Sequence, residues 1–321
     1  MPIKNTAAYL RKCIDSIIEQ TYTDWELIAI DDHSDDGSYK ILQLYAAKYS
    51  HIHTYKNEGK GIINALRLAF ANSQGQYITR MDSDDIMMPQ KIDLLRAALT
   101  DRKQVSVGLV QYFSDDTLGE GYIKYADWLN KMTINKSNFS EIYKECVIPS
   151  PCWMIHRDDF IDLGSFASDI YPEDYDLAFR MRNYGLVIRP VPEIIHLWRD
   201  HPSRASRNDP NYMDNQFINI KVHHFLLSDY NASQPLVVWG AGKKGKKIVQ
   251  LLKVQNIDVH WICNNTKKIG TKIYDILLHA PHYLDAISSP QIIIAVAQKN
   301  AQTEIESTLQ QNGEYTALYF C

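Results

Sequence analysis

The sequence predicts an α/β protein with two domains, each built on a mostly parallel sheet covered by helices. Over the first hundred residues, apolar runs typical of buried strands alternate with stretches whose apolar residues recur at helical spacing. A second alternation of this kind begins after Pro235. Strands that alternate with helices favour a parallel sheet. Because the stretch at 228–234 is polar, we expect one domain at 1–228 and another at 235–321.

The elements of the first domain follow from the spacing of its apolar residues. Between Leu10 and Ile18 apolar side chains recur three and four positions apart, which predicts an amphipathic helix. The same reasoning predicts helices at 6–20, 38–48, 59–72, 89–99 and 171–184, and strands at 25–30, 51–56, 76–81 and 105–113. Residues 115–170 show no regular period, and we expect the polar, basic stretch from His196 to Arg207 to be a loop.

The second domain is expected to be a smaller α/β unit with a glycine-rich turn after its first strand. Apolar runs predict strands at 236–239, 259–263 and 292–296, and an amphipathic helix around 248–252. Between the first strand and the helix, Gly240, Gly242 and Gly245 have the G-x-G-x-x-G spacing that lets a phosphate approach a helix N-terminus.

That glycine pattern is incomplete as a dinucleotide fingerprint. An acidic residue normally follows about 20 positions later and binds a ribose. Here Asn264 and Asn265 stand at the end of the second strand instead. A phosphate-binding role and a purely structural role for the turn are therefore equal alternatives.

The composition is that of a globular protein without a strong charge bias. The 321 residues are 45% hydrophobic and 22% charged, with a formal net charge of -4, which argues against a protein that coats nucleic acid. No apolar run approaches the roughly 18 residues that span a bilayer. The first residues lack the apolar core of a signal peptide, and the five cysteines form no C-x-x-C pair. We expect a cytoplasmic protein, with peripheral membrane association left open.

The acidic run Asp82-Ser83-Asp84-Asp85 directly follows a predicted buried strand. Carboxylates packed this closely repel one another unless they face solvent or surround a cation. Mg²⁺ and Mn²⁺ prefer such oxygen ligands and also bind phosphate oxygens. In parallel sheets ligands bind beyond the carboxyl ends of the strands. The position therefore favours a metal site, although the four residues alone fit a solvated turn equally well.

Other charged groups are weaker candidates when each is taken alone. Asp32 ends another predicted strand, where it can accept hydrogen bonds from a base or a ribose. Glu173 and Asp174 open a predicted helix, so they are either a general base or ordinary first-turn acids. Arg199 and His201 lie in the basic stretch and can bind a diphosphate or belong to a solvated loop.

Taken in order, these pieces resemble the family 2 glycosyltransferases of the GT-A fold. The resemblance covers about residues 1–207, and six motifs in the right order make it specific. The matching stretches are Met1–Leu10, Ser16–Tyr22, Trp25–Ser38, Gly75–Asp85, Pro172–Arg180 and Trp198–His201. The second domain resembles the small Rossmann-like domain found beside some sugar-modifying enzymes.

The resemblance implies a site for a nucleotide-diphosphate sugar, with UDP as the expected nucleotide. Asn5 and Asp32 would lie by the base and the ribose. Asp82 would contact the ribose or the metal, and Asp84 would hold Mn²⁺ or Mg²⁺ against the diphosphate. Arg199 and His201 would lie by that diphosphate.

The resemblance also implies an inverting transfer to an acceptor hydroxyl. Asp174 would take the proton of that hydroxyl, and Glu173 would orient the acceptor or the start of the helix. The expected partners are a UDP-sugar donor and a glycan or lipid-linked sugar acceptor, in bacterial polysaccharide synthesis at the inner face of the membrane. Two other functions stay open: an inactive nucleotide- or glycan-binding protein, and an NAD(P)-binding oxidoreductase that uses the second domain.

One departure from the family concerns the start of the first domain. Family members open with an apolar, central strand, and here Met1 stands where that strand would end. We expect that strand to be missing because of a late start. A missing central strand would leave backbone donors and acceptors of its neighbours unpaired.

Overall fold

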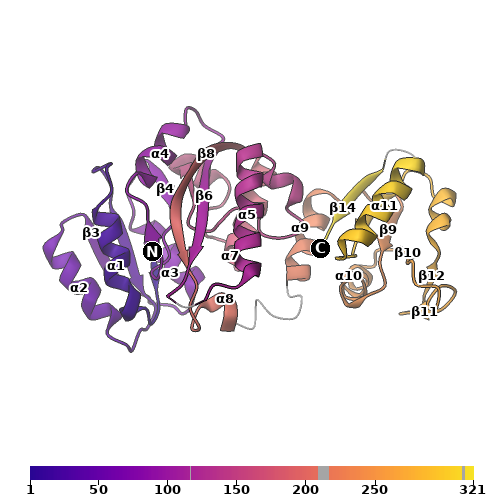
Figure 1. Ribbon diagram of the computed structural model, residues 1–321, viewed down its shortest axis with the longest axis horizontal. Coiled ribbons are helices and arrows are strands. Elements are labelled where there is room, and N and C mark those ends of the chain that lie inside the picture. Colours follow the sequence, from indigo (N-terminus) through magenta and orange to yellow (C-terminus); the bar gives the residue numbers. More distant parts are fainter. Residues whose placement is uncertain (116, 209–216, 313–314) are drawn as a thin grey trace. The chain divides into compact units, whose positions relative to one another are not determined.

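The computed structural model describes residues 1–115, 117–208, 217–312 and 315–321, which form two compact units (Figure 1). Unit 1 comprises Met1–Ser140 and Cys146–Asn208, and unit 2 comprises Glu141–Glu145 and Asp209–Cys321. These limits differ from the predicted domains, 1–228 and 235–321, because helix α9 (Phe217–Ser228) folds with unit 2. The predicted first domain also spans 209–216, which lie outside the described residues.

A parallel sheet of short strands opens unit 1. Its order is β1 (Pro2–Ile3), β2 (Leu27–Asp31) and β3 (Ile52–Lys56). Every residue of β2 is buried, as its apolar run predicts. Helices α1 (Ala7–Ile18), α2 (Ser38–Lys48) and α3 (Ile62–Ala71) alternate with these strands. Ile28 and Ile30 of β2 pack against Ala65 and Ala69 of α3, which places this part of the core between sheet and helix.

A second, mixed sheet completes unit 1. Its order is β4 (Tyr77–Thr79), β7 (Trp153–His156), β6 (Gln104–Phe113), β8 (Val187–Arg199) and β5 (Ile86–Met87). The long strands β6 and β8 are parallel, and the Ile195 side chain fills the space beside Gly108, where an added Cβ would lie 2.2 Å from its Cδ1. The helices of this part are α4 (Lys91–Ala98), α5 (Glu120–Asn135), α6 (Arg157–Asp162) and α7 (Glu173–Tyr184). Helix α5 packs on β6 and β8 (Figure 1).

A cavity of about 500 Å³ lies between the two sheets of unit 1. Leu27 and Ile28 of β2 line it on one side, and Tyr77 and Thr79 of β4 line it on the other. At the place of the expected first strand, β1 has two residues and pairs with β2. Within the described ranges, no strand pairing joins the two sheets, and α1 connects them by packing against β5.

The predicted loop from His196 to Arg207 is wrong at both ends. His196 to Arg199 form the end of β8, where His196 pairs with β5 on one side and β6 on the other. Residues Ala205–Asn208 form the short helix α8. The polar residues misled the prediction because this strand buries some of them, and His196 is 0% exposed. The irregular stretch 115–170 also contains helix α5, whose buried stripe includes Ala126, Leu129 and Met132.

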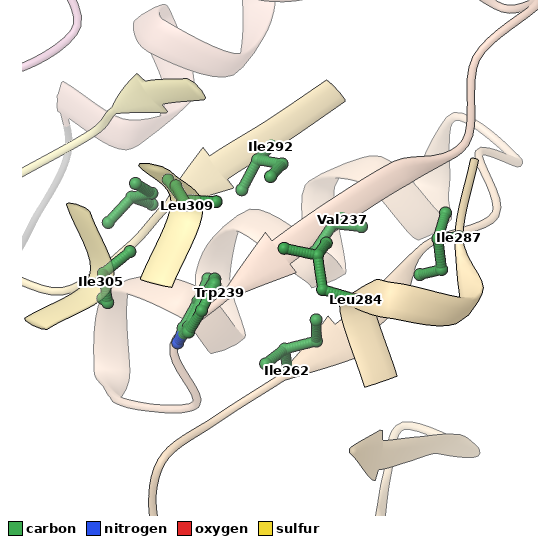
Figure 2. Packing of buried hydrophobic residues seen from close by; sticks show 9 residues of the cluster. Val237, Trp239, Ile262, Leu284, Ile287, Ile292, Ile305 and Leu309 are labelled. Carbon is green, nitrogen blue, oxygen red and sulfur yellow. The ribbon is translucent and has the colours of Figure 1, made fainter. Parts of the chain in front are cut away.

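Unit 2 is a separate α/β unit with its own core. Its sheet runs in the order β11 (Lys272–Ile273), β12 (Ile276–His279), β10 (His260–Ile262), β9 (Leu236–Trp239), β13 (Gln291–Ile294) and β14 (Thr316–Tyr319). All pairs are parallel except β11 with β12. Helices α10 (Lys243–Val254) and α11 (Lys299–Asn312) join α9 in this unit. Figure 2 shows Val237 and Trp239 of β9 packed with Ile262, Ile292 and Leu309.

The three strands predicted for this part of the chain are confirmed to within about two residues, and the predicted helix is confirmed but begins about five residues earlier, at Lys243. The α/β fold class is confirmed as well, since both units place helices beside parallel strands. None of the described helices has the length and apolar character that a bilayer-spanning segment needs.

Candidate functional site

The acidic turn, Asp82 to Asp85, connects β4 to β5 at the edge of the second sheet. The side chains of Asp82 and Asp84 are 22% and 18% exposed, whereas Asp85 is buried. Burial and the neighbouring carboxylates of Asp84 and Asp82 raise the pKa of Asp85 well above its usual range. The turn is therefore a concentration of negative charge whose two outer carboxylates reach solvent.

Arg80 links this turn to the start of helix α7. Its Nε donates to Oδ1 of Asp82 at 3.1 Å, and its Nη1 donates to Oε1 of Glu173 at 2.8 Å. The side chains of Arg80 and Glu173 are each 7% exposed, so the ion pair is shielded from water. One guanidinium thus holds together two predicted site segments that lie far apart in the sequence.

Asp174 follows Glu173 in the first turn of α7 and is partly exposed. Its Oδ1 accepts the backbone N–H of Tyr175 at 2.8 Å. Burial and the adjacent Glu173 carboxylate raise the pKa of Asp174 to about 7. A carboxylate with such a pKa can accept a proton near neutral pH, as a general base must.

A small cavity of about 10 Å³ opens beside Asp174. Ile148, Ser150, Trp153 and Leu177 also line it. The buried Oγ of Ser150 has no hydrogen-bond partner in the part of the chain that the structure describes. A space of this size holds about one water molecule or hydroxyl group. The cavity therefore offers room for a single polar group next to the candidate base.

Arg199 and His201 both contact the acidic turn. Nε of Arg199 donates to the backbone oxygen of Asp84 at 2.8 Å, and Nε2 of His201 lies 2.8 Å from Oδ2 of the same residue. The guanidinium of Arg199 is held between the rings of Tyr9 and Phe113, at 4.9 and 4.4 Å from their centroids. The structure thus brings the two predicted basic residues to the predicted metal ligand.

Asn5 and Asp32 lie at the ends of β1 and β2, and both are engaged by neighbouring protein groups. Asp32 Oδ1 accepts from Asn57 Nδ2 at 2.7 Å and from the backbone N–H of Gly61 at 3.0 Å. Asn5 Oδ1 accepts the backbone N–H of Asp35 at 2.9 Å. These bonds give both residues a role in holding the loops at this edge of the sheet.

The loop that carries Asn5 also reaches the acidic turn. Thr6 Oγ1 donates to Ser83 Oγ at 3.0 Å, and from the following helix α1 the Sγ of Cys13 lies 3.4 Å from the backbone oxygen of Asp82. The segments that follow β1 and β4, which carry Asn5 and Asp82, are therefore neighbours.

The acidic turn fits a cation that arrives with phosphate groups. Among the described residues, no three side chains of His, Cys, Asp or Glu form a ready metal cage. Mg²⁺ usually needs only one or two protein carboxylates, because phosphate oxygens and water complete its shell. Asp82 and Asp84 supply two partly exposed carboxylates, and His201 stands beside them.

In unit 2, packing accounts for two of the three glycines in the turn before α10. A Cβ added at Gly240 would lie 3.0 Å from the backbone oxygen of Ala295. A Cβ added at Gly245 would lie 1.9 Å from the backbone oxygen of Gly240. Gly242, by contrast, has no other described atom within 4 Å of the position of an added side chain. Asn264, at the place of the ribose acid, accepts from Trp239 Nε1 at 2.7 Å.

Two solved structures with a similar fold were found in complex with nucleotide sugars. The Staphylococcus aureus TarS 1-349 structure in complex with UDP-GlcNAc aligns with a TM-score of 0.55 at 14% identity, over 78% of this chain and 70% of that chain. The mannosyltransferase PcManGT from Pyrobaculum calidifontis, in complex with GDP-Man and Mn²⁺, aligns with a TM-score of 0.52 at 17% identity. That alignment covers 78% of this chain and 66% of that chain. At these identities the likeness shows the fold, and it confirms the predicted GT-A fold.

Sequence comparison gives the family. Glycosyltransferase GlyG of Streptococcus pneumoniae serotype 4 (strain ATCC BAA-334 / TIGR4) is 32% identical over 117 residues, which are 36% of this chain and 38% of GlyG. This chain therefore matches well under half the length of that relative. Residues 1–164, just over half of the 321, match the sequence profile of glycosyl transferase family 2. The chain belongs to glycosyl transferase family 2.

Proposed function

We propose that the protein is an inverting glycosyltransferase that moves a sugar from a nucleotide-diphosphate donor to an acceptor hydroxyl with the help of a divalent cation. The observation that carries the proposal is the pair of bonds from Arg80 to Asp82 and Glu173. These bonds bring the acidic turn next to the first turn of α7, which carries Asp174. The two segments that we assign to the cation and to the base are therefore next to each other in unit 1.

On the donor side, Asp84 and Asp82 would hold Mn²⁺ or Mg²⁺. When bound, the cation offsets the negative charge that grows on the departing diphosphate. Arg199 and His201 contact Asp84, and their side chains would add positive or hydrogen-bonding groups beside the phosphates. The TarS complex with UDP-GlcNAc and the PcManGT complex with GDP-Man and Mn²⁺ support a nucleotide-sugar donor. We favour UDP as the nucleotide.

On the acceptor side, Asp174 would act as the base. Its carboxylate takes the proton of the acceptor hydroxyl while that oxygen bonds to the anomeric carbon. The bond between this carbon and the diphosphate oxygen breaks, and the nucleoside diphosphate leaves with the electron pair. Because attack comes from the opposite face, the configuration inverts. General-base help of this kind is typically worth about 10²–10⁴-fold in rate.

The biological setting that we propose is bacterial polysaccharide synthesis in the cytoplasm, at the inner face of the membrane. The acceptor would be a glycan or a lipid-linked sugar. Support comes from the family and from the bacterial glycosyltransferase GlyG that the chain resembles.

Two binding and turnover measurements test the proposal. Calorimetric titration with UDP, with and without Mn²⁺, should show binding that needs the cation. A panel of nucleotide sugars should then reveal the donor by release of its nucleoside diphosphate, with water as the acceptor where no sugar acceptor is known. UDP binding without any turnover over the panel would favour an inactive binding protein. NADH binding without UDP binding would refute the proposal.

A further inference from the structure

Three buried side chains form a hydrogen-bonded chain directly behind the acidic turn. Lys91 begins α4, His196 lies in β8, Asp85 ends the turn, and none of them is more than 1% exposed. Nζ of Lys91 lies 3.2 Å from Nδ1 of His196, and Nε2 of His196 lies 2.9 Å from Oδ2 of Asp85. With Lys91 charged, its ammonium group only donates, so Nδ1 of His196 accepts from Lys91 and Nε2 donates to Asp85.

Stability alone does not explain why these groups are buried. Removing ionisable groups from water costs free energy that their mutual contacts only about offset, and well-packed apolar residues often do as well or better. A buried polar network does restrict geometry, since each partner accepts only a narrow range of positions. The chain from Lys91 to Asp85 is therefore better explained by what it holds in place.

Asp85 ties the acidic turn to the end of β8. Its Oδ1 accepts the backbone N–H of Arg199 at 2.7 Å, while its Oδ2 is the end point of the chain from Lys91. Arg199 in turn donates from Nε to the backbone oxygen of Asp84 at 2.8 Å. Two residues further on, His201 reaches the Asp84 carboxylate at 2.8 Å. The spacing between Asp84 and the two basic residues thus depends on where Asp85 holds the backbone of Arg199.

We propose that Lys91, His196 and Asp85 are positioning residues that fix Asp84, Arg199 and His201 as one preformed receptor for a cation-bound diphosphate. This inference rests on the proposed function and deepens it. Lys91 orients the His196 ring, His196 orients the Asp85 carboxylate, and Asp85 sets the position of the β8 end. All three act through other residues, because their side chains are buried and do not reach solvent.

Substitutions that remove one link at a time test the inference in the full chain. Lys91→Met removes the donor and keeps the length of the side chain. His196→Asn places an amide near Nδ1 and leaves Asp85 without its donor, whereas His196→Gln places an amide near Nε2 and keeps that donor. The readouts are the affinity for UDP in the presence of Mn²⁺ and the hydrogen-exchange rate of the Arg199 amide in the metal-free protein.

We expect Lys91→Met and His196→Asn each to weaken Mn²⁺-dependent UDP binding by about 10- to 100-fold, as outer-shell substitutions do elsewhere. Both should speed exchange of the Arg199 amide by about 10-fold, because local opening there becomes easier. His196→Gln should recover most of both effects. Val105→Ala is the matched control, because Val105 is buried in β6 away from these three side chains. The substitution lowers stability by leaving a cavity, but it should change neither readout.

The inference would be overturned if folded Lys91→Met and His196→Asn both bound UDP with wild-type affinity in the presence of Mn²⁺ and exchanged the Arg199 amide at the wild-type rate, whatever their thermal stability. Should Lys91→Met fail to fold, the comparison of the two His196 variants decides, since equal effects of Asn and Gln would also overturn it. Failure of the proposed function is recognised separately, because the wild-type chain would then bind no UDP with Mn²⁺. In that case the exchange rate of the Arg199 amide still tests whether the three residues hold the end of β8.

Discussion

Asp82 and Glu173 share one guanidinium, because Arg80 donates to Oδ1 of the first at 3.1 Å and to Oε1 of the second at 2.8 Å. The first belongs to the acidic turn and the second opens the helix of the candidate base. A displacement of either segment would break a shielded ion pair. Arg80 therefore couples the position of the acidic turn to that of the first turn of α7.

Arg80→Met should destabilise unit 1 and impair any transfer activity. The substitution leaves the Glu173 carboxylate buried without its cation, and breaking a buried pair in this way costs about 3–5 kcal/mol. The stability of Arg80→Lys should lie between those of the wild type and Arg80→Met, since lysine keeps the charge but cannot bond to both partners in the same geometry. Urea unfolding followed by circular dichroism measures the difference.

Arg96→Met is the control for that substitution. Arg96 pairs with Asp93 at 3.3 Å on α4 and lies over the Tyr22 ring at 4.8 Å, and such partly exposed contacts each contribute about 0–1 kcal/mol. Equal stabilities of Arg80→Met and Arg96→Met would show that the Arg80 bridge is not formed in solution.

Asp84→Ala should abolish Mn²⁺-dependent UDP binding while the fold persists. The side chain is partly exposed and pairs with His201, so its loss removes a carboxylate rather than a core residue. Since outer-shell substitutions cost 10–100-fold in metal affinity, removal of a direct ligand should cost at least about 100-fold. Titration calorimetry measures this, with the exposed Asp93→Ala as control. Unchanged affinity in Asp84→Ala would exclude Asp84 as a ligand.

The sequence predicted those candidate site residues whose place follows from the pattern of the neighbouring strand or helix. Asp82 and Asp84 follow a strand, Glu173 and Asp174 open a helix, and such positions can be recognised without knowing the rest of the fold. The structure places them near one another through Arg80, a residue that the sequence pattern did not single out.

The missed parts depend on contacts between distant segments. Asp85 meets His196 across 111 positions, and that contact exists only because β8 continues through His196 between β6 and β5. The polar residues of that strand led to the prediction of a loop, because the spacing of apolar residues cannot reveal that a histidine is buried. Helix α5 was missed for a related reason, because many of its sixteen residues face solvent and weaken its apolar period.

Transfer should depend on pH through Asp174, whose pKa is raised to about 7 by burial and by Glu173. A base must be ionised, so kcat/KM should rise as the pH increases through about 7 and level off above it. Asp174→Asn should keep UDP binding and lose transfer at every pH. Initial rates of nucleoside diphosphate release between about pH 5 and pH 9 measure the profile, and a profile that is flat through pH 7 would remove Asp174 from this role.

The raised pKa of Asp174 also predicts a pH effect on stability, opposite in sign to the effect on kcat/KM. The folded state holds the Asp174 proton up to about pH 7, whereas an unfolded aspartate loses it near pH 4. Between these values the folded state binds more protons, so the contribution of Asp174 to stability falls as the pH rises. Asp174→Asn should therefore raise the melting temperature relative to wild type more at pH 8 than at pH 4. Equal shifts at both pH values would contradict the raised pKa.

Gly245→Ala and Gly242→Ala should separate packing from any other role of the turn before α10. A side chain at Gly245 would lie 1.9 Å from the backbone oxygen of Gly240, an atom that cannot move without displacing the end of β9. Overpacking of this kind costs about 1–3 kcal/mol, or more where backbone must shift, whereas Gly242→Ala meets open space and loses only the N-cap preference for glycine over alanine, about 1 kcal/mol or less. Thermal unfolding followed by tryptophan fluorescence can report on this unit, since Trp239 and Trp261 lie in its core strands. Equal stability of the two variants would mean that α10 does not approach the turn as closely as the structure shows, and the packing explanation for Gly245 would fail.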